Sequence, residues 1–231
     1  MSISRRRFLR YAACLPPAVL AVQAIEAGSS ACAARAGRKY CLILNGSCAL
    51  KESLEGYAMG LRAAKAPFEI ASLRTAKPAP VIIAPAASLT DIHQVCWLRT
   101  QIEAGALALV ESGGAFLSST AFRRQQSVIR SQLKLTMLQP VMLWGTQDSA
   151  RGLPYVDFTW PVPARVRDFS KMIALNGEGA AAIARIEDKP VAFKLRLGAG
   201  NLVFLGSPLG PHILAGDREA QRWLEAFWGH A

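Results

Sequence analysis

The sequence holds few of the residues that bind metals or carry thiol chemistry. Its 231 residues include five cysteines and three histidines. No two cysteines form a C-x-x-C pair, and the histidines are scattered at positions 93, 212 and 230. Structural zinc sites instead need such side chains clustered at short spacings. The sequence therefore predicts no metal site and no cofactor.

The N-terminal apolar run is too short to cross a bilayer as a helix. Residues 11–25 make a run of about 15 residues, where roughly 20 are needed. The run follows Ser4-Arg5-Arg6-Arg7-Phe8-Leu9-Arg10 and precedes the small residues of Ala31-Cys32-Ala33. This order is typical of a twin-arginine export signal, which is an address and not an anchor. We expect residues 1–33 to be removed and residues 34–231 to form a single domain in the periplasm.

Two alternatives stay open for the N-terminal segment. It could be an ordinary amphipathic helix, or Ser30-Ala31-Cys32 could be a lipoprotein site with Cys32 lipidated. The expectation that the protein is exported to the periplasm depends on the interpretation of this segment as a twin-arginine signal.

Acidic residues are scarce relative to basic ones. Lys and Arg number 27 against 16 Asp and Glu, a formal net charge of +11. Such a charge favours anionic partners. Export and the lack of interleaved aromatic and basic residues argue against nucleic acid. We expect an envelope protein or a small ligand as partner. Peripheral contact with an anionic membrane surface is a further possibility, through the basic residues of one predicted helix: Arg123, Arg124, Arg130 and Lys134.

Beyond residue 39 the chain alternates between short apolar runs and helical periodicity. Runs typical of buried strands lie at 40–44, 68–73, 81–84 and 107–110. Helical patterns cover 49–64, 91–103 and 121–134. This order predicts an α/β domain with a mainly parallel, flavodoxin-like sheet and helices on both faces. Shorter, proline-punctuated segments after residue 139 predict extra strands in the second half, and a last helix starts near Asp217.

Three stretches resemble the class I glutamine amidotransferase-like superfamily. They are residues 81–91, residues 97–114 and residues 197–208. Active members of that superfamily carry a cysteine nucleophile at the turn after the central strand and a histidine after a late strand. Here the turn reads Val110-Glu111-Ser112-Gly113-Gly114, and Gly206-Ser207-Pro208 follows the late strand. The resemblance therefore implies a divergent member without the catalytic cysteine.

The resulting expectation is an exported periplasmic binding or assembly protein with a non-catalytic domain. Because ligands of α/β sheets bind at the carboxyl ends of strands, a binding crevice is expected at two such ends. The residues that would line it are Asn45, Gly46, Glu111, Gly113 and Gly114.

Two alternative functions are kept. In a serine-dependent hydrolase, Ser112 would be the nucleophile and His212 its base, with Asp217 or Glu219 orienting the imidazole. His212 could equally pack in a loop beside Pro211. The other alternative is an envelope-surface interaction module that uses the basic helix.

Overall fold

A computed structural model describes residues 39–46, 48–143, 154–168 and 170–230. The predictions for the signal segment of residues 1–33, including Cys32, lie outside these residues. Export and a periplasmic location therefore stay predictions. Within the described residues, no helix combines the length and the apolar character that crossing a membrane requires.

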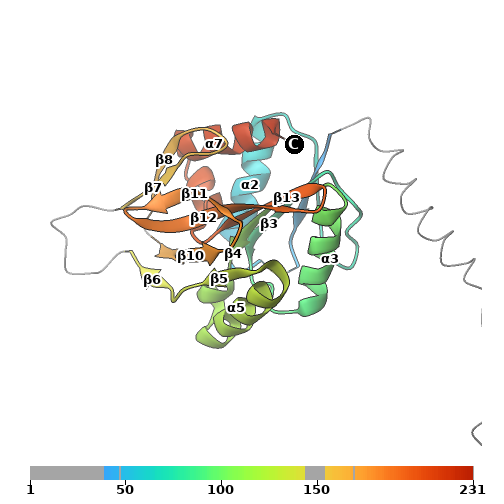
Figure 1. Cartoon of the computed structure of the whole chain (residues 1–231). Coiled ribbons are helices and arrows are strands. Elements are labelled where there is room, and N and C mark those ends of the chain that lie inside the picture. The colour runs from blue at the N-terminus through green and yellow to red at the C-terminus, as the bar shows by residue number, and fades with distance from the viewer. Residues whose placement is uncertain (1–38, 47, 144–153, 169, 231) are drawn as a thin grey trace, which may run out of the picture. The chain divides into compact units, whose positions relative to one another are not determined.

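A nine-stranded sheet forms the centre of the described domain (Figure 1). The first five strands in spatial order run parallel to one another: β2 (Phe68–Ala71), β1 (Cys41–Leu44), β3 (Val81–Ala87), β4 (Leu107–Ser112) and β13 (Gly200–Leu205). The other four continue the sheet in antiparallel pairs: β12 (Lys189–Leu197), β11 (Ala181–Ile186), β7 (Tyr155–Phe158) and β8 (Ala164–Arg167).

The predicted mainly parallel, flavodoxin-like sheet is wrong. Four neighbouring pairs are parallel and four are antiparallel. The physical reason lies in the connections, because parallel strands need a crossover of a dozen or so residues, whereas a hairpin needs about two. Only Glu187 and Asp188 join β11 to β12, and only Gly198 and Ala199 join β12 to β13.

Two apolar clusters lie on opposite sides of the parallel strands, because successive side chains of a strand point to opposite faces. Ile43 and Ile83 pack in the cluster that contains α2 (Lys51–Ala63), α6 (Gly210–Leu214) and α7 (Arg218–Gly229). Leu42 and Ile82 pack in the other, with α3 (Ile92–Glu103), α4 (Gly114–Leu117) and α5 (Ser119–Leu133). Each fully buried Ile or Leu stabilises the fold by about 1.5–3 kcal/mol.

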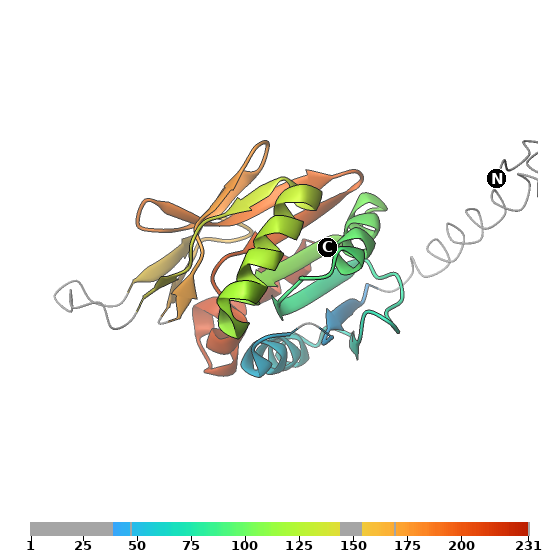
Figure 2. The ribbon, with the colours of Figure 1, turned by 90° about the horizontal axis from the view of Figure 1, so that it is seen from below.

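Two short antiparallel ribbons lie outside the main sheet. One pairs β5 (Leu135–Met137) with β10 (Leu175–Gly177), and the other pairs β6 (Val141–Met142) with β9 (Lys171–Met172). Figure 2 shows α5 running lengthwise on the outside of the domain. The β6–β9 ribbon and the start of α5 form walls of an open cleft.

Candidate functional site

Glu111, near the carboxyl end of the central strand β4, is fully buried and holds several elements together. Its side chain is 0% exposed. It accepts hydrogen bonds from five donors: Ser53 Oγ (2.8 Å), Tyr57 Oη (2.6 Å), Ala86 N (3.0 Å), Leu209 N (2.6 Å) and Gly210 N (2.9 Å). An ionised carboxylate offers about four lone-pair sites, so these donors leave Glu111 no capacity for a ligand. Burial, and then the charge of Glu111, raises the pKa of Tyr57, which therefore keeps the proton that it donates.

Asp168, just after β8, is a second buried carboxylate of the same kind. Its carboxylate accepts hydrogen bonds from Ser170 N (2.8 Å), Ser170 Oγ (2.7 Å) and Ser207 Oγ, and it lies 3.6 Å from His212 Nε2. Burial raises the pKa of Asp168, but the hydrogen bonds from His212, Ser207 and Ser170 outweigh burial and leave that pKa below its usual value. Asp168 is therefore a carboxylate at neutral pH.

Glu111 and Asp168 both bind the segment that follows β13. Glu111 binds the N–H groups of Leu209 and Gly210, and Asp168 binds Ser207 and His212. We call Glu111, Asp168 and the donors that they bind the carboxylate clamp. The clamp occupies the carboxyl ends of β4 and β13, where an α/β sheet ordinarily places its ligand.

Glycine lets α2 and α6 come close enough to complete the clamp. A Cβ at Gly56 would lie 1.9 Å from the carbonyl oxygen of Gly210, and a Cβ at Gly210 would lie 2.6 Å from the Cα of Ser53. Any larger residue at either position would push α6 away from Glu111.

Ser112 and His212, the predicted catalytic pair, have different partners in the structure. The Ser112 hydroxyl is buried and donates to Gln125 Oε1 at 2.9 Å. His212 lies against Asp168. The Ser112–His212 pairing stays a prediction.

Asp217 and Glu219, which were expected to orient His212, contact other groups instead. Asp217 accepts hydrogen bonds from Glu219 N (2.8 Å) and Ala220 N (3.1 Å), so it caps α7. The Glu219 side chain pairs with Arg222 at 2.5 Å. Asp168 stands beside His212 instead, and sequence reasoning missed it. The Asp168-x-Ser170 spacing of an Asx turn was the available signal, but it does not indicate His212.

The structure does not bring the residues of the predicted binding crevice together on one open surface. Asn45 and Gly46 are exposed after β1, whereas Glu111, Gly113 and Gly114 are buried. The N–H of Gly113 donates to Ala87 O at 2.8 Å, and that of Gly114 donates to Gln125 Oε1 at 3.0 Å. Both glycine amides are therefore engaged within the protein.

The metal-ligating side chains and thiols of the described part of the chain do not gather into one site. No group of three or more His, Cys, Asp or Glu residues there could hold a metal ion. Cys41, Cys48 and Cys96 are free thiols. Burial raises the pKa of the Cys41 thiol far above its usual value, and burial also raises that of Cys48. Neither is activated as a thiolate nucleophile.

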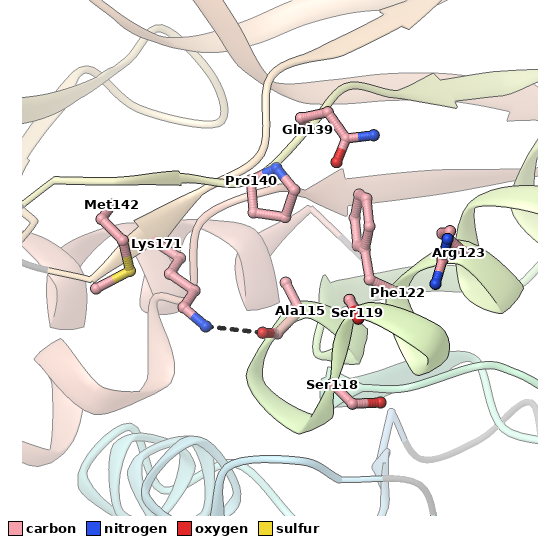
Figure 3. A pocket seen from close by; sticks show the side chains of 9 residues that line it. All are labelled: Ala115, Ser118, Ser119, Phe122, Arg123, Gln139, Pro140, Met142 and Lys171. Atoms are coloured by element: carbon pink, nitrogen blue, oxygen red, sulfur yellow. Dashed lines mark hydrogen bonds between the residues drawn. The ribbon is translucent and has the colours of Figure 1, made fainter.

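An open cleft lies beside the clamp, between α4, the start of α5 and the β6–β9 ribbon (Figure 3). Its volume is about 510 Å³, within the range of small-ligand sites. We call it the α5 cleft. It is lined by Ala115, Ser118, Ser119, Phe122, Arg123, Gln139, Pro140, Met142 and Lys171.

Two cations and an aromatic ring dominate the α5 cleft. Figure 3 shows Lys171 and Arg123 on opposite sides of Phe122. Lys171 Nζ donates to Ala115 O at 2.9 Å and lies 5.6 Å from the centre of the Phe116 ring. Since an ammonium has three donors, Lys171 keeps further donors for a ligand. None of the nine lining residues is acidic, so the cleft favours an anionic group.

The chain matches no family model and none of the curated proteins. It is similar in fold to several solved structures. The exo-β-1,4-mannosidase Op5Man5 from Opitutaceae bacterium strain TAV5 matches with a TM-score of 0.58 at 12% identity, over 91% of this chain and 38% of that one. The cold-adapted β-galactosidase from Rahnella sp. R3 matches with a TM-score of 0.60 at 16% identity, over 91% and 34%.

A cytoplasmic protein from Salmonella typhimurium LT2 matches over almost its whole length. Its TM-score is 0.58 at 13% identity, over 82% of this chain and 98% of that one. At these identities the likeness establishes the fold alone. The chain spans little more than a third of the two glycosidases.

These comparisons correct two predictions. The resemblance to the class I glutamine amidotransferase-like superfamily is wrong, because the fold neighbours named here are glycosidases and the Salmonella protein. The expectation of a non-catalytic binding or assembly protein is also wrong, because neighbours that are hydrolases point away from it. The chain therefore shares its fold with part of proteins that are hydrolases.

Proposed function

We propose that this chain is a protein of the hydrolase type that acts on a carbohydrate with an anionic group, and that the α5 cleft binds this substrate. The observation that carries the proposal is the pair of cations, Lys171 and Arg123, in an open cleft without acidic residues. The carbohydrate class is supported by the activities for which the neighbours are named, those of a mannosidase and of β-galactosidases.

The lining fits an acidic sugar in its chemistry. The Phe122 ring can pack against the apolar C–H face of a sugar ring, while Gln139 and Ser119 can meet its hydroxyl groups. A sugar carboxylate would pair with Lys171 or, with two parallel hydrogen bonds, with the guanidinium of Arg123. Because glycoside hydrolysis ordinarily uses two carboxyl groups, the contribution of this lining is to bind and orient the substrate.

Titration of the purified chain with galacturonate and with galactose tests the proposal. Galacturonate should bind about tenfold more tightly, because one charge-assisted hydrogen bond contributes ~1.4 kcal/mol. Lys171→Gln should remove most of this preference, and Lys77→Gln, a change at an exposed lysine outside the cleft, should not. Release of reducing ends from polygalacturonate measures turnover. Equal affinities for the two sugars, or a Lys171→Gln variant with unchanged preference, would contradict the proposal.

A second candidate keeps the hydrolase class but uses a serine nucleophile. The observation that favours it is the Asp168 carboxylate beside His212, since such a carboxylate orients an imidazole base. Ser112 would act after its hydroxyl leaves Gln125. A fluorophosphonate probe should then label the folded chain and fail to label Ser112→Ala. Equal labelling of both, or none of either, counts against this candidate.

A further inference from the structure

A second hollow continues from the α5 cleft along the outer side of the same helix. Its volume is about 620 Å³. We call it the α5 groove, and its lining is Arg123, Gln126, Ser127, Arg130, Ser131, Lys134 and Thr136. Arg123 lines both hollows, so the cleft and the groove meet at this side chain.

The cations of the groove stand in a row. Arg123, Arg130 and Lys134 are all exposed. With a rise of about 1.5 Å per residue, Arg130 lies about 10 Å along the helix axis from Arg123, and Lys134 about 6 Å further. This row presents positive charge at intervals over several turns of α5.

No salt bridge among the described residues neutralises this row. The sequence of α5 contains no Asp or Glu. The salt bridges among the described residues involve other side chains. The remaining groove residues are amides and hydroxyls, which can bind sugar hydroxyl groups.

We infer that a polyanionic polysaccharide chain occupies both hollows, with one acidic sugar in the α5 cleft and the following sugars along the α5 groove. The inference rests on the proposed function and names its substrate class as a polymer. Arg123 would contact the chain where it passes from the cleft to the groove. Arg130 and Lys134 would pair with anionic groups further along the chain.

The shape and composition of the groove favour a polysaccharide over other polyanions. Single-stranded nucleic acid is bound through base stacking on aromatic side chains, and none of the seven groove residues is aromatic. A membrane presents a flat charged plane, whereas this hollow follows one helix and leads into a cleft.

The test compares galacturonate with its octamer in calorimetric titrations of the full-length protein. Each exposed charge removed should weaken binding about fivefold, the upper end for exposed ion pairs, so Arg130→Gln/Lys134→Gln should weaken octamer binding about 25-fold. The same double variant should leave the affinity for galacturonate unchanged. Arg124→Gln/Lys77→Gln removes two exposed charges outside both hollows and should change neither affinity.

Arg123→Gln should weaken the binding of both ligands, since Arg123 lines both hollows. An octamer that binds no more tightly than galacturonate, or one weakened equally by the two double variants, overturns the inference while the proposed function stands. Tighter binding to vesicles of anionic lipid, or to a single-stranded oligonucleotide, than to the octamer also overturns it. Absence of galacturonate binding instead overturns the proposed function, and the polymer inference with it.

Discussion

The carboxylate clamp and the α5 cleft lie near the same end of the sheet, yet they use polar residues in opposite ways. In the clamp, the buried oxygens of Glu111 and Asp168 are bound by internal donors. In the cleft, Lys171 and Arg123 face an open hollow. This difference shows that a polar residue at a strand end indicates a ligand site only when it still has hydrogen-bond donors or acceptors that the protein does not engage.

Loss of the Glu111 carboxylate should lower the free energy of unfolding more than any other change to the clamp or the cleft. Glu111→Ala would strand five buried donors, and breaking a buried charged network costs about 3–5 kcal/mol of unfolding free energy. Urea denaturation followed by circular dichroism measures the change. The matched control Glu178→Ala, at an exposed turn, should shift stability by no more than about 0.5 kcal/mol. A similarly small shift in Glu111→Ala would show that the clamp does not stabilise the fold.

The close contact of α2 with α6 should be nearly as sensitive. Gly56→Ala places a Cβ against the carbonyl oxygen of Gly210, and overpacking of this kind costs about 1–3 kcal/mol. Gly229→Ala is the control, because a Cβ there meets nothing within 4 Å. Equal urea midpoints for the two variants would mean that the helices can separate without cost.

Acid should weaken the clamp through Asp168. Its pKa is lower in the folded chain than its usual value of about 3.9. The stability that this difference contributes is therefore present in full above about pH 4 and is lost as pH falls toward the folded-state pKa. Urea midpoints measured between about pH 6 and pH 3 should fall more steeply for the wild type than for Asp168→Asn. Parallel curves for the two proteins would show that Asp168 does not have a lowered pKa.

Neutralising one cation of the cleft should have the smallest effect. Lys171→Gln should leave the unfolding free energy within about 0.5 kcal/mol of the wild type, because the side chain is only half-buried. It should weaken galacturonate binding all the same. Substantial destabilisation would instead place Lys171 among the structural residues, through its bond to Ala115 O.

Much of the secondary structure could be predicted from apolar patterns. The runs at 40–44, 81–84 and 107–110 correspond to β1, β3 and β4. The last helix buries Ala220, Trp223, Leu224 and Phe227, the face that the helical spacing indicates. An apolar run does not reveal whether its neighbours are parallel or antiparallel. The antiparallel direction of β11, β12 and β13 depends on the two-residue connections between them.

The site was harder to predict than the strands. The basic face of 121–134 was visible in the sequence, and it supplies Arg123, Arg130 and Lys134 to the two hollows. Lys171 reaches the same cleft across 56 residues of chain, and no local pattern indicates that contact. Glu111 and Ser112 stood at the expected strand end, but their burial depended on donors from distant segments. A sequence shows residue types. Whether the donors and acceptors of a residue stay available to a ligand depends on those long-range contacts.

One measurement tests the central claim most directly, namely that the open hollows on α5 and not the buried strand ends bind the ligand. Arg123 and Arg124 are adjacent, exposed and equally charged, but only Arg123 lines the cleft and the groove. The affinity for the galacturonate octamer should fall about fivefold in Arg123→Gln and stay at the wild-type value in Arg124→Gln. Equal affinities for the two variants would contradict the account.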